Sequence, residues 1–170
     1  IHRFTDTWAP EEGGGPAGPV AVEVHAAVGG AVTACCLESA AVDRVLYNYV
    51  NNAARFAADR RVGLWVFPAG PRLLRWVVEN AVAPDQAEFL AAPAGGDLRG
   101  LFAGGRTSGG SGVGLSACAD MIAECFGLPT PAEAVARGYL GAKLDGGCFR
   151  SWFHWPALGR AAPPDRDTGP

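Results

Sequence analysis

RVLYNYVNNAARF, residues 44–56, is the stretch that decides the fold. Its apolar residues recur at the three- and four-residue spacing of a helix with one buried face, and Ser39 is the predicted N-cap. On the other face Asn48 and Asn52 are four residues apart, and Arg55 follows three residues later. Asparagine is a poor helix former because its amide competes with the backbone, so this polar face indicates a specific role.

The polar face has the chemistry of a magnesium and phosphate site. An asparagine carbonyl oxygen is a hard ligand for Mg²⁺, Arg55 can pair with phosphate oxygens, and Phe56 can lie against a base. The alternative is that the amides cap a loop and that Arg55 is a solvated surface residue. The helix alone does not choose between these two interpretations.

A second stretch, GRTSGGSGVGL at residues 105–115, favours the ligand site. It ends in a G-x-G-x-G pattern that runs directly into a helical pattern over residues 115–127, for which Gly127 is the predicted stop. Glycines let a backbone come close to a ligand, and a helix N-terminus offers free N–H groups to an anion. Composition alone would equally allow a Gly/Ser linker, but the flanking helix favours a phosphate-binding loop.

The rest of the chain predicts one mixed sheet. Strands are expected at residues 20–27, 31–38, 62–67, 72–80 and 146–156, with the third and fourth forming a hairpin about a turn at 68–71. Short helices are expected at 84–92 and 129–142. The segment 1–8, before a Pro/Gly-rich connector, is either a separate strand or a remnant of a preceding region. The order β-β-α-β-β-α-α-β indicates an α+β fold, a two-layer sandwich whose mixed, mostly antiparallel sheet is covered by helices on one face.

Composition limits the class of protein. With 170 residues, of which 49% are hydrophobic and 18% charged, the chain is long enough for one globular domain. A net charge of −3 without a basic stripe argues against a nucleic-acid partner, and no apolar run is long enough to span a bilayer. The five cysteines form no CxxC pair, so we expect reduced, packed thiols in a cytoplasmic protein rather than a zinc site.

Three motifs together resemble the catalytic, ATP-binding domain of sensor histidine kinases, in the wider superfamily of the Hsp90, gyrase and MutL ATPases. Residues 44–56 are similar to the N box of that family, LRGLF at 98–102 to its F box, and GGSGVGL at 109–115 to its second glycine box. The order and separation of the motifs match as well. The resemblance implies the Bergerat-type ATP-binding fold.

The resemblance also divides the chain into three parts. It covers residues 20–156, which it identifies as the ATP-binding catalytic domain. Residues 1–19 are then an N-terminal segment and linker, and residues 157–170 a flexible tail. Because the sequence begins at Ile1 rather than at a methionine, we expect it to be a piece of a longer protein.

The resemblance implies roles for individual residues. Asn52 matches the Mg²⁺-binding asparagine, with Asn48 one turn earlier on the same face. Arg55 matches the basic phosphate contact, and Phe56 the aromatic residue beside the adenine. The residues that match the glycine box around the triphosphate are Gly110, Gly112, Val113, Gly114 and Leu115. The implied cofactors are ATP and Mg²⁺.

The first glycine box of the family, D-x-G-x-G, is altered. This chain has VVENAVAPDQ at residues 77–86, with Asn80 in place of the aspartate that receives the adenine amino group. An asparagine oxygen accepts the same hydrogen bond without charge, a loss of about 1–2 kcal/mol. Ala81 and Val82 follow where glycine is expected, so they could fill the adenine pocket.

A second departure is the insertion PTPAEAVARGYLGAKL at residues 129–144. It either covers the sheet or forms a docking surface, and cover is the favoured interpretation.

Three functions fit this pattern. The first is the ATP-binding catalytic domain of a bacterial sensor histidine kinase, which binds Mg-ATP and donates the γ-phosphate to a histidine on a separate dimerisation domain. The second is a degenerate domain of the same fold, with weak or no ATP binding, used as a protein-docking or phosphotransfer module. The third is a superfamily ATPase with another acceptor, such as a serine-directed anti-sigma-type kinase.

The expected partners follow from the first function. The histidines His2, His25 and His154 do not lie on a predicted helix with the pattern of a phosphoacceptor. The acceptor is therefore expected on the protein's own dimerisation domain, outside this chain, and a response regulator is the second expected partner. No nucleic-acid contact and no membrane contact are expected, and the expected location is cytoplasmic.

Overall fold

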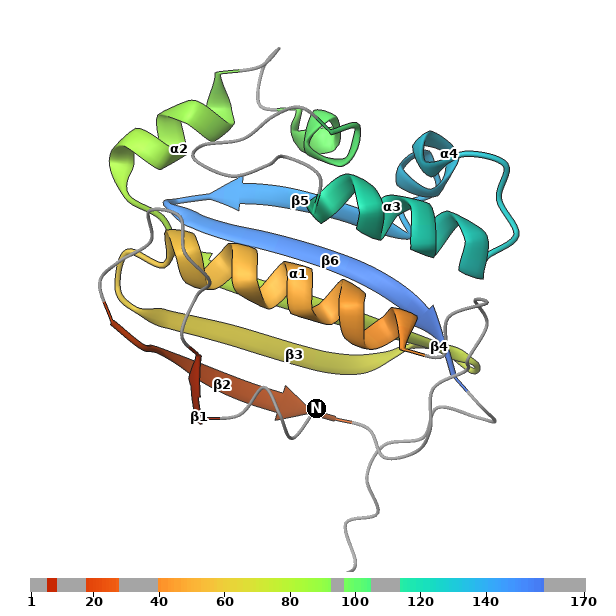
Figure 1. Cartoon of the computed structure of the whole chain (residues 1–170), viewed down its shortest axis with the longest axis horizontal. Helices are drawn as coiled ribbons and strands as arrows, with labels where there is room; N and C mark the ends of the chain where they lie inside the picture. Colours follow the sequence, from red (N-terminus) through yellow and green to blue (C-terminus); the bar gives the residue numbers. More distant parts are fainter. Residues whose placement is uncertain (1–5, 9–17, 28–39, 93–96, 105–113, 158–170) are drawn as a thin grey trace, which may run out of the picture.

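The computed structural model describes residues 6–8, 18–27, 40–92, 97–104 and 114–157. These residues form a six-stranded sheet with helices on one face (Figure 1). The strands are β1 (Asp6–Trp8), β2 (Val20–Ala26), β3 (Arg61–Gly70), β4 (Leu73–Ala81), β5 (Leu140–Asp145) and β6 (Cys148–Pro156). The helices are α1 (Ala41–Phe56), α2 (Pro84–Ala91), the 3₁₀-helix η2 (Leu98–Phe102), α3 (Gly114–Cys125) and α4 (Pro131–Ala136). The predicted α+β sandwich is confirmed.

The sheet is mixed and mostly antiparallel, as predicted. Its strand order is β1-β2-β3-β4-β6-β5. Only β2 and β3 are parallel among the neighbouring pairs of the described sheet. Parallel neighbours need a crossover connection, and α1 supplies it, so this helix lies across the sheet (Figure 1).

The first helix follows the predicted apolar spacing. Its buried residues are Ala41, Val45, Leu46, Tyr49, Val50, Ala53 and Ala54. The N-cap position is Ala40, which has no side chain that can cap, so the prediction of Ser39 as N-cap is wrong by one residue. Ser39 itself lies outside the described residues. The core, not the cap, therefore holds this helix in place.

Most of the other predicted elements are confirmed with shifted ends. The hairpin of β3 and β4 turns at residues 71–72 rather than 68–71, because β3 continues to Gly70 through an irregularity in its register. The helix α3 ends at Cys125, and Gly127, the predicted stop, follows it with a φ of 62°; the Leu128 N–H closes the cap on the Ala123 carbonyl at 2.8 Å. The predicted strand at 31–38 lies outside the described residues.

The insertion at 129–144 is only partly a helix. α4 occupies residues 131–136, capped by the Thr130 side chain, which accepts from the Glu133 N–H at 3.3 Å. The expected helix at 129–142 is wrong beyond that point, because Gly138 has a φ of 75° and the chain then forms β5. The insertion therefore adds an edge strand to the sheet as well as a covering helix (Figure 1).

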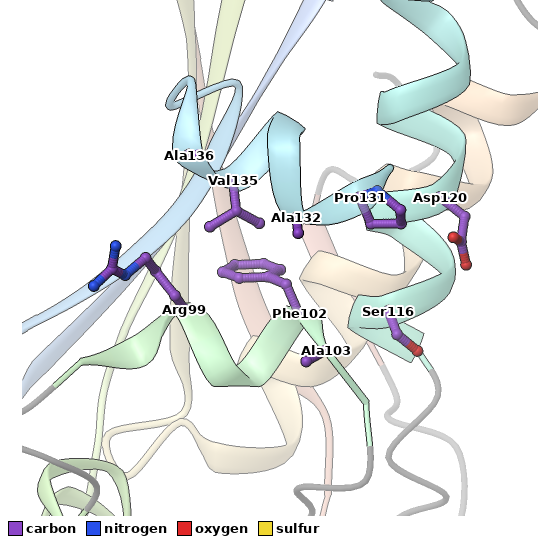
Figure 2. A pocket seen from close by; sticks show the side chains of 9 residues that line it. All are labelled: Arg99, Phe102, Ala103, Ser116, Asp120, Pro131, Ala132, Val135 and Ala136. Carbon is purple, nitrogen blue, oxygen red and sulfur yellow. The ribbon is translucent and has the colours of Figure 1, made fainter. Parts of the chain in front are cut away.

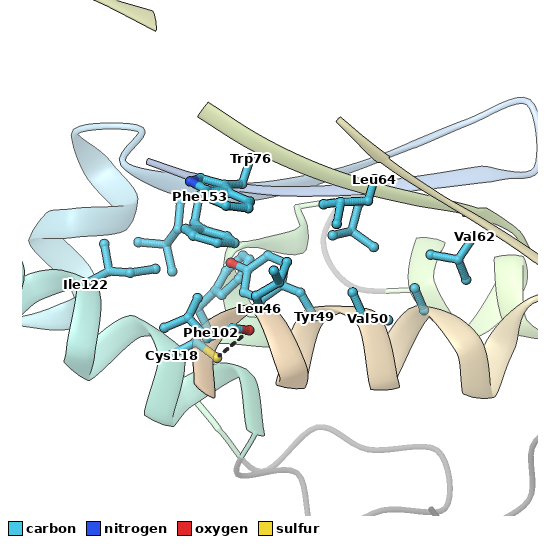
Figure 3. Close-up of a cluster of buried hydrophobic side chains, with 14 of the residues drawn as sticks. Leu46, Tyr49, Val50, Val62, Leu64, Trp76, Phe102, Cys118, Ile122 and Phe153 are labelled. Atoms are coloured by element: carbon cyan, nitrogen blue, oxygen red, sulfur yellow. Dashed lines mark hydrogen bonds between the residues drawn. The ribbon is translucent and has the colours of Figure 1, made fainter. Parts of the chain in front are cut away.

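The core lies between the sheet and the helices (Figure 3). Tyr49 of α1 is 1% exposed, and its ring meets that of Phe153 edge-on at 5.1 Å. Its hydroxyl donates to the Trp152 carbonyl at 3.2 Å. The Phe153 ring stacks on Trp76 of β4, with centroids 5.7 Å apart. This aromatic group joins α1 to the centre of the sheet.

Two further expectations from composition concern the state of the cysteines and the presence of membrane-spanning segments. Cys118 and Cys148 are free thiols, but Cys125 is disulfide-bonded, so the prediction of five reduced cysteines is wrong for Cys125. Within the described ranges, no helix combines the length and the apolarity that crossing a membrane requires.

The buried thiol of Cys118 makes stability depend on pH. Burial raises the pKa of Cys118 from 9.0 to about 12, against smaller lowering effects of Asn48 and Arg44. The unfolded chain therefore loses this proton at lower pH than the folded protein, and stability falls as pH rises from about 9 towards 12. In the wild type, this thiol should lower the free energy of unfolding by about 1.4 kcal/mol for each pH unit in that window. We expect Cys118→Ala to remove this part of the pH dependence.

Urea unfolding between pH 7 and 11 measures this dependence. Cys148→Ala is the matched control, since that thiol is less buried. Equal alkaline slopes for the wild type and Cys118→Ala would contradict the assignment.

Candidate functional site

The candidate site begins with the outward stripe of α1. The buried side of this helix faces the sheet through Tyr49 and its neighbours. Asn48, Asn52 and Arg55 follow one another at four and three residues, so they share one flank of the helix. All three are half-buried rather than fully solvated. The stripe extends over roughly 10 Å, at 1.5 Å per residue.

At one end of the stripe, Asn48 meets the start of α3. Its Nδ2 donates to the Arg44 carbonyl at 3.0 Å. This bond lies within the helix and gives the donor group of the amide a partner. Its Oδ1 lies 3.4 Å from the position that a Cβ on Gly114 would take. The structure therefore brings together the predicted N box and the described end of the predicted glycine box.

The packing of α3 on α1 explains this approach. Cys118, one turn after Gly114, is fully buried, and its Sγ lies 3.9 Å from the Val45 carbonyl (Figure 3). The small thiol lets the two helices come close. Leu115, the last residue of the predicted glycine box, is half-buried against the core.

The middle of the stripe is Asn52. Within the described part of the chain, its amide has no hydrogen-bond or ionic partner. A half-buried amide on a rigid helix, with its oxygen uncommitted, is suited to a hard cation. No group of three or more His, Cys, Asp or Glu side chains in the described residues could hold a metal by itself.

The other end of the stripe is cationic and aromatic. The Arg55 guanidinium lies over the Phe56 ring, with Cζ 5.4 Å from the centroid. The Ala58 N–H donates to the Ala81 carbonyl at 2.9 Å, which ties the end of α1 to the end of β4. Asn80, the residue before Ala81, is therefore at the same end of the stripe.

Asn80 is the most unusual polar residue in the structure. It pairs with Val62 and Phe149 in the sheet and points to the helix-covered face, where it is 3% exposed. Its Nδ2 donates to the Ala81 carbonyl at 3.0 Å, but its Oδ1 has no hydrogen-bond partner among the described residues. A buried acceptor of this kind costs about 1–3 kcal/mol unless a donor reaches it.

One contact at the edge of the stripe was missed by the sequence reasoning. The Trp8 indole N–H donates to Asn51 Oδ1 at 3.4 Å, and the Trp8 ring meets Tyr47 edge-on at 5.3 Å. β1 holds Trp8 there by pairing with β2. Asn51 is thus committed to Trp8, unlike Asn52 beside it. No sequence signal links residues 43 positions apart in this way.

Some of the other predicted site residues lie outside the residues that the structure describes. Gly110, Gly112 and Val113 do not belong to the described residues. Phe102 of the predicted F box is 3% exposed at the end of η2, next to α3 and α4. The described parts of the three predicted motifs therefore lie around α1 and α3.

No protein-family model and no curated protein matches the chain. Among solved structures it is similar to full-length ShkA in complex with AMPPNP, with 22% identity over 84% of this chain and a TM-score of 0.50. The chain spans 27% of the length of ShkA. It is also similar to the mycobacterial sensor histidine kinase MprB, with 16% identity over 81% of this chain and 82% of that one, at a TM-score of 0.48.

A histidine kinase from Burkholderia phymatum STM815 is similar at 16% identity over 82% of this chain and 60% of that chain, with a TM-score of 0.49. At 22% identity, the likeness to ShkA is one of fold. It supports the ATP-binding fold that the sequence motifs predicted.

The contact between Gly114 and Asn48 can be tested by side-chain size. We expect Gly114→Ala to be tolerated, with a melting temperature equal to or above the wild type, because alanine favours a helix and 3.4 Å is an ordinary contact. Gly114→Val adds methyl groups that press on the Asn48 amide, and should lower the melting temperature by several degrees. Gly100→Val is the control, since a Cβ there meets nothing within 4 Å. A melting temperature for Gly114→Val equal to that of Gly114→Ala would contradict the contact.

Proposed function

We propose that this domain binds Mg-ATP and donates the γ-phosphate to a histidine on a separate dimerisation domain, as the catalytic domain of a sensor histidine kinase. The observation that carries the proposal is the uncommitted Asn52 amide on α1, on the same helix as the Asn48–Gly114 contact. The unpaired Asn80 oxygen belongs to β4, whose end is tied to the end of α1. A nucleotide triphosphate has groups that suit each of these three points.

The triphosphate fits the end of the stripe at Gly114. This residue begins α3, where free N–H groups and the positive end of the helix dipole favour an anion. Asn52 would hold the Mg²⁺ that bridges phosphate oxygens, and Arg55 would offset phosphate charge. Most of the rate would come from positioning and charge neutralisation.

The base fits the end of the stripe at Asn80. An adenine amino group is a donor that would satisfy the buried Oδ1. Phe56, at the same end of α1, offers an aromatic face for the ring. The similar structure of ShkA is a complex with AMPPNP, an ATP analogue, which adds fold-level support.

The acceptor histidine is expected on another domain. His25 of β2 stacks on Trp65, with centroids 5.2 Å apart, and His154 Nδ1 of β6 donates to the Tyr139 carbonyl at 3.1 Å. Both lie on strands rather than on a helix that could present a phosphoacceptor. A response regulator, and a cytoplasmic location, belong to the same proposal.

A second function is a degenerate domain with weak or no ATP binding, used in protein docking. It is favoured by Val82, which follows Asn80 in place of a glycine and is 8% exposed within the core. The Val82 N–H is also committed to the Gly147 carbonyl at 2.9 Å. A packed valine here reduces the space available to a base.

Nucleotide titration separates the two functions. We expect a fluorescent ATP analogue to bind in the presence of Mg²⁺, and Asn52→Ala to weaken the Mg²⁺-dependent binding at least about tenfold, or about 1.4 kcal/mol. Asn51→Ala is the matched control, because its amide is committed to Trp8 instead. A folded wild-type chain that binds no nucleotide at millimolar concentration would refute the kinase proposal and favour the degenerate domain.

The Asn80 oxygen gives a second prediction. Asn80→Leu removes the acceptor but keeps the volume, so affinity for adenine nucleotides should fall about 5- to 30-fold, or about 1–2 kcal/mol. The free energy of unfolding should change little, because removal of the unpaired buried oxygen offsets the loss of the Nδ2 bond to the Ala81 carbonyl. Ser151→Ala removes a neighbouring buried hydrogen bond, to the Val78 carbonyl at 3.4 Å, and should lower stability without changing affinity. Unchanged affinity in Asn80→Leu would place the base elsewhere.

A further inference from the structure

A cavity of about 570 Å³ lies between η2, α3 and α4. Figure 2 shows the Phe102 ring beside Val135, with Ser116 and Asp120 on the α3 side. The other apolar walls come from α4 and the residue after η2, and include Pro131 and Ala132. The volume is in the range of pockets that hold small molecules, and the lining is mainly apolar with a few polar groups.

The cavity is on the opposite side of α3 from the candidate nucleotide site. Ser116 and Asp120 are one turn apart and face α4. Cys118 and Ile122 are fully buried on the other side of the same helix, where the Cys118 Sγ meets α1. The α1 stripe and the cavity are therefore separate surfaces, with α3 between them.

Among the described side chains around the cavity, the charges give its α3 side a net negative charge. Arg99 is held by two bonds to Asp97, from Nε at 2.9 Å and from Nη2 at 2.7 Å, so this pair is close to neutral. The Arg99 bonds hold the pKa of Asp97 at about 2, which keeps the pair ionised over the physiological range. Asp120 has no ion-pair or hydrogen-bond partner in the described ranges, and its carboxylate is solvent-accessible.

We propose that this cavity binds a small amphipathic cation, with an apolar ring against the walls formed by Pro131, Ala132 and Val135 and an ammonium group at Asp120. The apolar walls match the body of such a ligand, and the unbalanced carboxylate at the α3 side selects the charge. The wall of α4 belongs to the insertion at 129–144, so this stretch, beyond covering the sheet, completes a binding site.

Phenethylamine is a suitable probe, and 3-phenylpropionate is its matched anion with the same ring. In amide ¹H–¹⁵N spectra of the whole chain, phenethylamine should shift the signals of η2, α3 and α4 with saturation, and 3-phenylpropionate should bind at least about fivefold more weakly. Equal binding of the two probes, or no saturable shift from phenethylamine up to tens of millimolar, would overturn the proposal.

Two variants locate the bound probe. Asp120→Asn changes an exposed side chain and should weaken phenethylamine at least about fivefold, whereas Asp85→Asn on α2 should leave it unchanged. Ala132→Trp fills the cavity from α4 and should abolish binding, with the melting temperature showing that it folds. If Asp120→Asn binds phenethylamine with wild-type affinity, the proposed role of the carboxylate is wrong, regardless of the result for Ala132→Trp.

A nucleotide competition separates this site from the proposed function. Phenethylamine affinity should be unchanged at saturating Mg-AMPPNP, and competitive displacement would show that the cavity belongs to the nucleotide site. If the chain binds no nucleotide, the kinase proposal fails, but the cation titrations still decide the cavity.

Discussion

The Tyr49 side chain fixes the orientation on which the site depends. Its ring lies against Phe153, and its hydroxyl donates to the backbone of β6 at 3.2 Å, so both its apolar and its polar parts are satisfied at 1% exposure. Rotation of α1 about its axis would break both contacts together. Because the stripe of Asn48, Asn52 and Arg55 lies on the flank of the same helix, its direction is set by this buried contact and not by the stripe itself.

The same constraint explains what the sequence could predict. Periodic apolar residues identify α1, α3 and the hairpin, because burial on one face leaves a repeat in the chain. β5 was missed because LGAKLD carries little strand signal and is held by pairing with β6. Gly141 is required there, since a Cβ would come within 2.4 Å of the Trp152 ring, and only the tertiary structure shows this. β1, three residues long, lies in the segment 1–8, where a separate strand was one of two interpretations that the sequence alone left open.

The candidate site, like the fold, could be predicted only in part from the sequence. The spacing of Asn48 and Asn52 predicted a shared face, and the glycine pattern predicted a helix start beside it; both are present where residues are described. The sequence could not show which asparagine is available. Asn48 is partly satisfied by its own helix and Asn51 by Trp8, which leaves Asn52 uncommitted. That difference depends on long-range packing and on hydrogen bonds, which composition and spacing do not contain.

The change from aspartate to asparagine at position 80 has a physical consequence of its own. At 3% exposure a carboxylate without a partner would cost far more than the amide, so asparagine is the less costly residue to bury at this position. The same change removes the charge that would strengthen a bond to an adenine amino group. The unpaired Oδ1 still favours any donor that reaches it, because pairing recovers the desolvation cost of about 1–3 kcal/mol. Under the proposed function, stability of the domain and affinity for a base are therefore opposed at this one residue, and Val82, packed in the core two positions later, would shift the balance further towards stability.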